Sequence, residues 1–232
     1  MSGQSLSPSE SVSLLWSAVV KICLFIFLLG ALILGAAGTF LYWEVYAYII
    51  LILIPMVFIL NFLLRESPQL LKHRMIYKER MASQKKVLWL SGIPMVGIYL
   101  IPGLDRRFGW SDVPWPLVIL ALGMVLMGYL LVINVFRYNA YASRIVELQE
   151  DQRVISTGPY GIIRHPMYAG ATLLYLATPL ALGSWWGILP ALLILPVLIL
   201  RIRGEESFLR ESLKGYKEYC NRIRFRLIPH IW

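Results

Sequence analysis

Long apolar stretches alternate with short charged segments along the chain. A helix needs about 20 apolar residues to cross ~30 Å of hydrocarbon. Four charge-free stretches have about this length, and each is bounded on both sides by charged residues, so each predicts one membrane-spanning helix. These stretches cover residues 22–43, 45–64, 87–104 and 113–136.

A fifth charge-free stretch, residues 167–200, is too long for one straight crossing. Gly183-Ser184 near its middle predicts a turn. We therefore expect a helical hairpin with arms at 167–182 and 185–200, and the prolines at positions 190 and 196 predict kinks in the second arm. Both arms are short for full spans, which leaves open whether they tilt, thin the bilayer or stop short of crossing it.

The composition supports a membrane protein. Hydrophobic residues make up 58% of the chain and charged residues 15%, whereas soluble domains carry about 25% charged residues. The net charge of +9 comes from basic residues between the apolar stretches, which argues against nucleic acid as a partner. With two cysteines, three histidines and no His-x-x-x-His pair, we expect neither a disulfide framework nor a metal site.

Basic residues predict the orientation, because Lys and Arg are retained on the cytoplasmic side of a membrane. Only Arg106 and Arg107 fall on the opposite side of the alternating spans, out of 22 Lys and Arg residues. The pattern predicts a multi-pass integral membrane protein with six crossings, with both termini on the cytoplasmic side. The count does not test the hairpin, because both its ends lie on one side whether or not it crosses.

The fold class that we expect is an all-α membrane bundle in three regions. Residues 1–12 are predicted to be disordered, and no basic residue precedes Lys21, so a cleaved signal peptide is not expected. Residues 13–133 form the scaffold of four spans, and residues 134–232 form the catalytic region. Its tail predicts one amphipathic helix on the cytoplasmic side, because apolar residues recur with helical spacing at Leu209, Leu213, Tyr216 and Cys220.

The first candidate site residues are Arg164-His165-Pro166, at the start of the first arm of the hairpin. Proline is favoured in the first turn of a helix, and free N–H groups at a helix start bind anions such as carboxylates. Arg164 and His165 would add donors there. The simpler alternative is an arginine that snorkels to the interface and a histidine that caps the helix. Polar residues at the end of the fourth span can line the same face, although a solvated helix exit is the simpler interpretation; they are Asn134, Arg137, Tyr138, Asn139 and Tyr141.

The return of the hairpin brings a second polar cluster to the same membrane face: Arg201, Arg203, Glu205 and Glu206. Carboxylates this close to hydrocarbon are costly unless they are paired or functional. Two polar clusters joined by an apolar turn are what a cofactor site at the membrane surface needs. Alternatively, the two glutamates begin the tail helix and pair with nearby arginines.

Three runs therefore stand in order in the second half of the chain: Gly158-Pro159-Tyr160 with Arg164-His165-Pro166-Met167-Tyr168, then Arg201-Ile202-Arg203-Gly204-Glu205-Glu206, then Gly215-Tyr216-Lys217-Glu218-Tyr219. This order resembles the isoprenylcysteine carboxyl methyltransferase family. That family shares its Arg-His-Pro-x-Tyr and Glu-Glu signature with membrane phospholipid N-methyltransferases. The resemblance covers residues 134–219, and the tail between Glu206 and Tyr216 is one residue shorter than the family pattern.

The resemblance implies a methyltransferase that uses S-adenosylmethionine, bound on the cytoplasmic side among helix ends. Arg201 matches the position that faces the methyl acceptor, which makes it the catalytic residue that we expect. The acceptor is expected to be a lipophilic molecule that enters from the bilayer among membrane lipids. The cofactor-binding residues implied are Gln152, Arg153, Val154, Ile155, Tyr160, Arg164, His165, Pro166, Met167, Tyr168, Glu205 and Glu206.

Several functions fit this pattern. A carboxylate acceptor of the isoprenylcysteine type needs only a positioning cation such as Arg201, whereas a phosphoethanolamine nitrogen must also lose a proton. The same arginine can grip a lipid phosphate, so N- or S-methylation of a phospholipid or small amphiphile is the alternative. A membrane sterol reductase fits the architecture, but the Arg-His-Pro-x-Tyr spacing favours methyl transfer. A non-catalytic lipid-binding or transport bundle is less favoured, because the spans carry almost no ionisable residues at mid-depth.

Overall fold

The computed structural model describes residues 8–75, 82–142, 148 and 152–232, and the secondary structure of these residues is helical throughout, without strands. A short 3-10 helix, η1 (Gly158–Gly161), precedes α6. The α-helices are α1 (Pro8–Ala37), α2 (Trp43–Glu66), α3 (Pro68–Arg74), α4 (Ala82–Phe108), α5 (Trp115–Tyr138), α6 (Pro166–Ala181), α7 (Ile188–Ser212) and α8 (Tyr216–Arg222).

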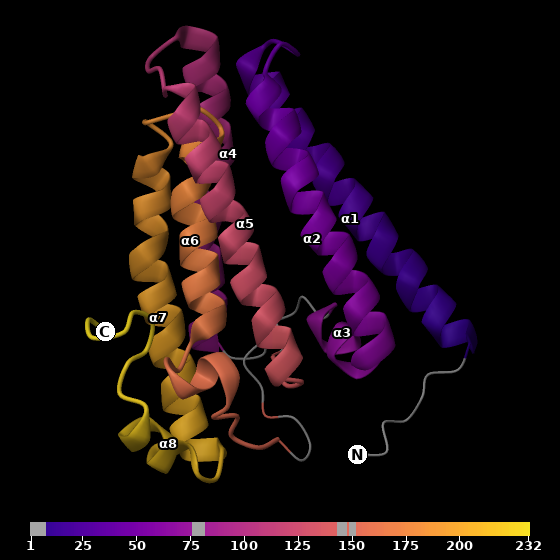
Figure 1. The fold of residues 1–232 in the computed structure, drawn as a ribbon, viewed down its shortest axis with the longest axis vertical. Helices are drawn as coiled ribbons and strands as arrows, with labels where there is room; N and C mark the ends of the chain where they lie inside the picture. The colour runs from indigo at the N-terminus through magenta and orange to yellow at the C-terminus, as the bar shows by residue number, and fades with distance from the viewer. Residues whose placement is uncertain (1–7, 76–81, 143–147, 149–151) are drawn as a thin grey trace.

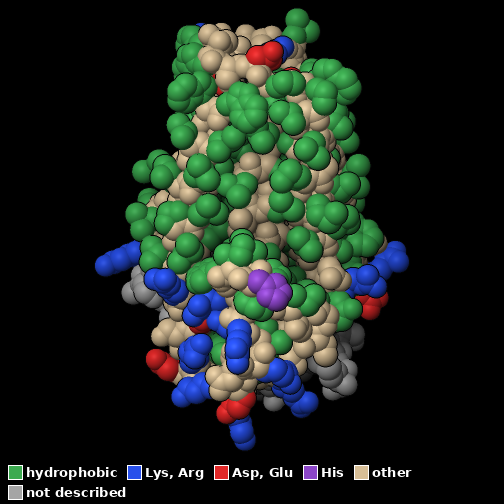
Figure 2. Space-filling view, turned by 60° about the vertical axis from the view of Figure 1, so that its left-hand side comes forward, with side chains coloured by type: hydrophobic (Ala, Val, Ile, Leu, Met, Phe, Trp, Pro, Cys, Tyr) green, Lys and Arg blue, Asp and Glu red, His purple; other side chains and the backbone are tan. Residues whose placement is uncertain are grey.

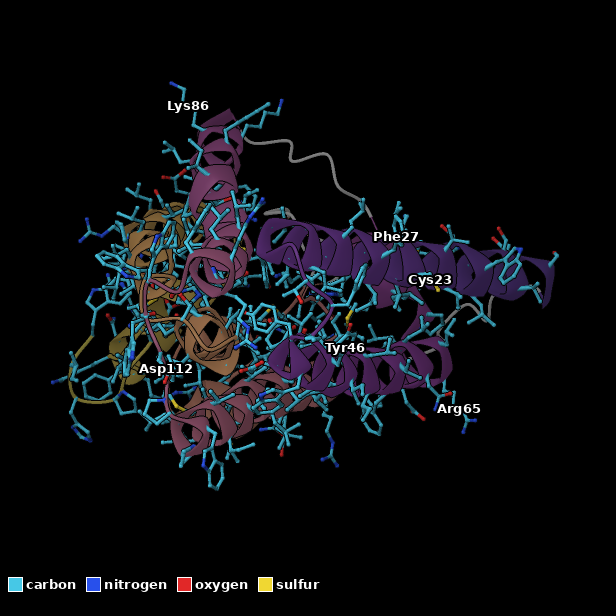
Figure 3. All side chains as sticks on the ribbon, turned by 90° about the horizontal axis from the view of Figure 1, so that it is seen from above. Cys23, Phe27, Tyr46, Arg65, Lys86 and Asp112 are labelled. Carbon is cyan, nitrogen blue, oxygen red and sulfur yellow. The ribbon has the colours of Figure 1, made fainter. Side chains whose placement is uncertain are left out.

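Four of the helices, α1, α2, α4 and α5, are long and apolar enough to cross a membrane. Each contains most of one of the four predicted spans. In the ribbon, α5, α6 and α7 lie side by side, and α8 lies at the end of the bundle where α7 finishes (Figure 1). Viewed along the bundle, α1 and α2 form a pair that leans away from the other helices, with Phe27 and Arg65 on that side (Figure 3). The chain is thus a helical membrane bundle.

The start of the chain differs from the prediction. The first helix begins at Pro8 and ends at Ala37, so residues 8–12, which were expected to be disordered, are helical, and the first span lies earlier than 22–43. Proline and an acidic residue, here Glu10, both favour a first helical turn. Gly38 ends the helix with a φ of 64°, a backbone conformation that glycine adopts without strain. Residues 1–7 lie outside the described residues.

The predicted hairpin is present. Helices α6 and α7 are joined by a turn in which Gly183 has a φ of 70°. The turn is tied to the last turn of α4, because the Ser184 hydroxyl donates a hydrogen bond to Asp105 Oδ2 at 2.5 Å. Helix α7 continues well past the predicted end of the second arm, to Ser212.

The predicted single tail helix is wrong. Residues up to Ser212 belong to α7, and Gly215 then adopts a φ of 84°, which separates α8 from α7. A left-handed residue cannot continue a right-handed helix. The apolar residues still pack together, because the break folds α8 back so that Leu209, Leu213, Tyr216, Tyr219 and Cys220 form one buried cluster.

Two glycines allow α5 and α6 to approach closely. A Cβ atom at Gly128 would lie 2.8 Å from the Gly170 carbonyl oxygen and 2.8 Å from Leu174 Cγ. At Gly123, on the same helix, a Cβ atom would have no neighbour within 4 Å. Gly128 therefore serves helix packing within one chain.

We expect Gly128→Ala to lower the stability of the bundle and Gly123→Ala to leave it unchanged or slightly raised. Overpacking of this kind typically costs ~1–3 kcal/mol, whereas alanine in an open helical position removes the entropic cost of glycine. Thermal unfolding in detergent, followed by circular dichroism, compares the two variants. Equal transition temperatures would contradict the close contact between α5 and α6.

The surface divides into an apolar band and a basic end. On the face that Figure 2 shows, hydrophobic side chains cover the long upper part of the bundle and most Lys and Arg side chains gather at the lower end. In Figure 1 the same end carries α3, α8 and the polar end of α7. We therefore expect any site for a water-soluble molecule to lie at this end of the bundle.

Candidate functional site

A pocket opens at the basic end of the bundle, where the described parts of five elements meet. Its cavity volume is about 120 Å³, and the space that includes its open mouth is about 870 Å³. The residues that follow α5, the 3-10 helix η1, and helices α6, α7 and α8 all contribute to its wall. The residues that line it are Asn139, Tyr141, Ala142, Gln152, Arg153, Val154, Ile155, Tyr160, Arg164, His165, Met167, Tyr168, Arg201, Glu205, Leu209, Leu213, Tyr216 and Tyr219.

The start of α6 is held by the tail of the chain. The backbone N–H groups of Arg164 and His165 donate to the carbonyl oxygens of Phe225 and Arg226, each at 2.9 Å. The Arg164 guanidinium donates from Nη1 to the carbonyl oxygens of Ile223 at 2.6 Å and Arg224 at 2.8 Å. The motif therefore lies between the pocket and the tail, and the tail fixes its backbone.

Glu206 is the centre of a buried ionic cluster. Its side chain is 4% exposed, and its carboxylate accepts from Arg164 Nε at 2.6 Å, His165 Nε2 at 3.2 Å and Arg226 Nε at 3.0 Å. Burial by itself would raise the pKa of this carboxyl, but the hydrogen bonds from His165 and Arg164 outweigh burial and lower the pKa of Glu206 to about 2. Glu206 is therefore ionised at neutral pH and ties α7 to the start of α6.

A second set of hydrogen bonds connects Glu205, the predicted cofactor-binding residue, with Arg201, the predicted acceptor-binding residue. The Tyr168 hydroxyl donates to Glu205 Oε2 at 2.7 Å, and Arg201 Nε donates to the Tyr168 oxygen at 3.3 Å. Tyr168 thus joins the residue expected to hold the cofactor to the residue expected to face the acceptor. These three side chains lie on two helices, α6 and α7, whose antiparallel packing brings them together.

Helix α4 completes this network through Gln84. Its buried side-chain oxygen accepts from Arg201 Nη1 at 2.8 Å. Gly204 makes room for it, because a Cβ atom at that position would collide with Gln84 Nε2. Sequence reasoning missed Gln84, since a single glutamine at the start of a span carries no signal that it will meet Arg201 on α7.

Aromatic and apolar side chains form much of the remaining wall. Asn139 Nδ2 donates to the Tyr160 hydroxyl oxygen at 2.7 Å, and the Tyr219 hydroxyl donates to the Tyr160 carbonyl oxygen at 2.8 Å. Burial raises the pKa of the Tyr160 phenol well above its ordinary value, so it stays neutral. Val154, from the segment 152–155, packs on the apolar cluster of α7 and α8.

The structure brings together all but two of the residues expected at the site. Pro166 is buried in the first turn of α6 and Glu206 lies behind Arg164, so neither is part of the wall. Arg164 reaches the wall, and its guanidinium donates to Glu206 and to tail carbonyl oxygens; its contact with an anionic ligand stays a prediction. Asn139 and Tyr141 do line the pocket, contrary to the simpler interpretation of a solvated helix exit.

Part of the chain is similar to known proteins. Residues 116–215 match the family model described as phospholipid methyltransferase. Delta(14)-sterol reductase from Mus musculus is 28% identical over 108 residues, which is 43% of this chain and 26% of the reductase, so the chain covers about a quarter of that relative. The family match contains Tyr168, Arg201 and Glu205, and supports a membrane methyltransferase-like protein. Gln84 and residues 216–232 lie outside it.

Proposed function

We propose that this protein is a membrane methyltransferase that uses S-adenosylmethionine to methylate a lipophilic acceptor. The observation that carries the proposal is the Glu205–Tyr168–Arg201 network, which lines one pocket at the polar end of a membrane bundle. A soluble cofactor and a bilayer-borne acceptor can meet there. The match to the phospholipid methyltransferase family model supports the same reaction class.

The pocket residues fit this cofactor chemically. Its ammonium and ribose hydroxyls suit the Glu205 carboxylate, and its positively charged sulfonium suits the tyrosine faces of the wall, here Tyr160, Tyr168, Tyr216 and Tyr219. When bound, S-adenosylmethionine supplies an already activated methyl group. The chain's own task is then to orient the acceptor and exclude water.

We infer an anionic acceptor headgroup, most simply the carboxylate of an isoprenylcysteine-type molecule. Arg201 lines the pocket and is 7% exposed, and the positive charge of its guanidinium suits a carboxylate. A carboxylate is ionised at neutral pH and needs no general base. A phospholipid amine or a small amphiphile is the alternative acceptor, with Arg201 on its phosphate or other anionic group.

A reductase is the second candidate function, because of the similarity to Delta(14)-sterol reductase. A reductase needs a hydride donor such as a reduced nicotinamide cofactor. The two candidates therefore predict different ligands for the same pocket.

Binding measurements separate these functions. Purified protein in detergent is titrated by calorimetry with S-adenosylmethionine, with its demethylated product, and with NADPH. Micromolar binding of the first two and none of NADPH supports the methyltransferase. Binding of NADPH alone supports the reductase, and binding of none of the three by folded protein contradicts both.

We expect Arg201→Ala to keep cofactor binding and lose methyl transfer. Glu205 and the aromatic wall remain, but the cation that positions the acceptor is gone. Loss of positioning by such a cation is expected to lower the rate of transfer to N-acetyl-S-farnesylcysteine at least 100-fold, measured with radiolabelled S-adenosylmethionine. If Arg201→Ala transfers methyl groups at the wild-type rate, Arg201 has no acceptor role.

We also propose the topology: the hairpin of α6 and α7 lies within the membrane with the four long helices, and the pocket and both termini face the cytoplasm. The concentration of Lys and Arg at the pocket end supports this orientation. It predicts that a cysteine introduced at Lys217 reacts with an impermeant thiol reagent only in inverted vesicles.

A further inference from the structure

Residues 224–232 fold back from α8 onto the bundle. Figure 1 shows the C-terminus beside α7, higher in the bundle than α8. The carbonyl oxygens of Phe225 and Arg226 accept hydrogen bonds from the residues just before Pro166, where the apolar arm α6 begins. The segment is therefore held at the boundary between the apolar band and the basic end.

The segment has a defined shape of its own. The Trp232 carbonyl oxygen accepts from the backbone N–H groups of Arg226 at 2.9 Å, Leu227 at 2.8 Å and Ile228 at 3.1 Å. The Arg226 guanidinium lies 5.3 Å from the centre of the Trp232 ring. These contacts close residues 226–232 into a loop, which presents a fixed outer surface.

Apart from the exposed His230, that outer surface is apolar. The side chains of Ile228 and Ile231 are 45% and 76% exposed, and exposure of such side chains to water costs about 25 cal/mol per Å². Arg222 and Arg224, which precede the loop, are exposed as well. Apolar side chains next to basic ones, at the edge of an apolar band, are typical of interfacial membrane anchors that favour anionic lipids.

We propose that residues 224–232 form an interfacial membrane contact, in which Ile228 and Ile231 enter the bilayer that surrounds the bundle and Arg222 and Arg224 face anionic headgroups. The same segment binds Arg164 and His165 through its backbone and Glu206 through Arg226. Contact with the bilayer therefore braces the wall of the pocket. The stabilisation of the pocket wall rests on the proposed function, and the membrane contact does not.

Lipid quenching of a fluorophore tests the contact directly. Cysteine replaces Ile231 in one variant and Lys217, exposed on α8, in a matched control, both with Cys23→Ser because Cys23 is exposed. The full-length proteins carry an environment-sensitive fluorophore and are placed in vesicles with 30% anionic lipid and a shallow lipid-borne nitroxide. We expect the label at 231 to be quenched at least threefold more than the label at 217. Equal quenching of both labels, or stronger quenching at 231 by aqueous iodide, would overturn the contact and point to a protein partner or to solvent.

Cofactor affinity tests whether the membrane contact of residues 224–232 stabilises the pocket wall. Ile231→Asp is expected to weaken S-adenosylmethionine binding at least threefold in vesicles relative to wild type, with Lys217→Asp unchanged. If wild type binds and Ile231→Asp binds equally well, the bracing is wrong even where the quenching result holds. If wild type does not bind S-adenosylmethionine, the proposed function fails, and the quenching result still decides the membrane contact.

Discussion

The Glu205→Gln variant is expected to lose S-adenosylmethionine binding and keep its fold. Glu205 is the carboxylate among the described residues that line the pocket, and a charge-assisted hydrogen bond to the ammonium or ribose of the cofactor contributes ~1.5–3 kcal/mol. Glutamine keeps the size of the side chain and can still accept from Tyr168, so packing is preserved. A loss of at least ~1.5–3 kcal/mol corresponds to a Kd about 10- to 150-fold higher.

Calorimetry of wild type and Glu205→Gln measures this loss. Glu211→Gln is the matched control, because Glu211 lies on the same helix, is exposed and is absent from the pocket wall. Both variants remove one negative charge, so a general effect of net charge would weaken binding equally in the two. Unchanged affinity in Glu205→Gln would remove Glu205 from the cofactor site.

The Arg164→Met variant is expected to destabilise the protein by ~3–5 kcal/mol, because it removes one of the three close donors to a buried carboxylate. The side chains of Arg164 and Glu206 are each 4% exposed. Arg210 also approaches Glu206, at 3.9 Å, but its side chain is 40% exposed. The same substitution at Arg210 should therefore cost less than ~1 kcal/mol.

Denaturant titration in mixed micelles compares the two arginine variants. Adding Glu206→Met to Arg164→Met should recover part of the lost stability, since no unpaired charge is then buried. Equal losses for Arg164→Met and Arg210→Met would show that burial does not set the strength of these pairs.

The pH dependence of stability has a definite sign for this cluster. The pKa of Glu206 is lowered from 4.5 to about 2, so the cluster contributes fully above pH 4.5 and loses its contribution as the pH falls toward 2. The difference in melting temperature between wild type and Glu206→Gln should shrink over this range. A difference that stays constant from pH 6 to pH 2.5 would contradict the lowered pKa.

Much of the site could be predicted from the sequence because its chemistry is concentrated in two short runs. Arg164 to Tyr168 and Arg201 to Glu206 carry polar groups where an apolar hairpin begins and ends, and a hairpin must return to the membrane face from which it left. The different roles of the two adjacent glutamates could not be predicted. Glu205 and Glu206 are adjacent, yet one faces the pocket and the other is buried behind Arg164, since successive residues on a helix point about 100° apart.

By itself, the sequence determined the membrane class, the four long spans, the hairpin and the polar face that holds the pocket. These follow from runs of apolar residues and from the position of charges, both of which act locally through transfer from water to hydrocarbon. Only the tertiary structure decided that Gln84 meets Arg201, that α5 and α6 touch at Gly128, and that residues 224–232 hold the start of α6. These contacts join segments far apart in the chain, and they depend on how helices pack, which no local pattern of residues encodes.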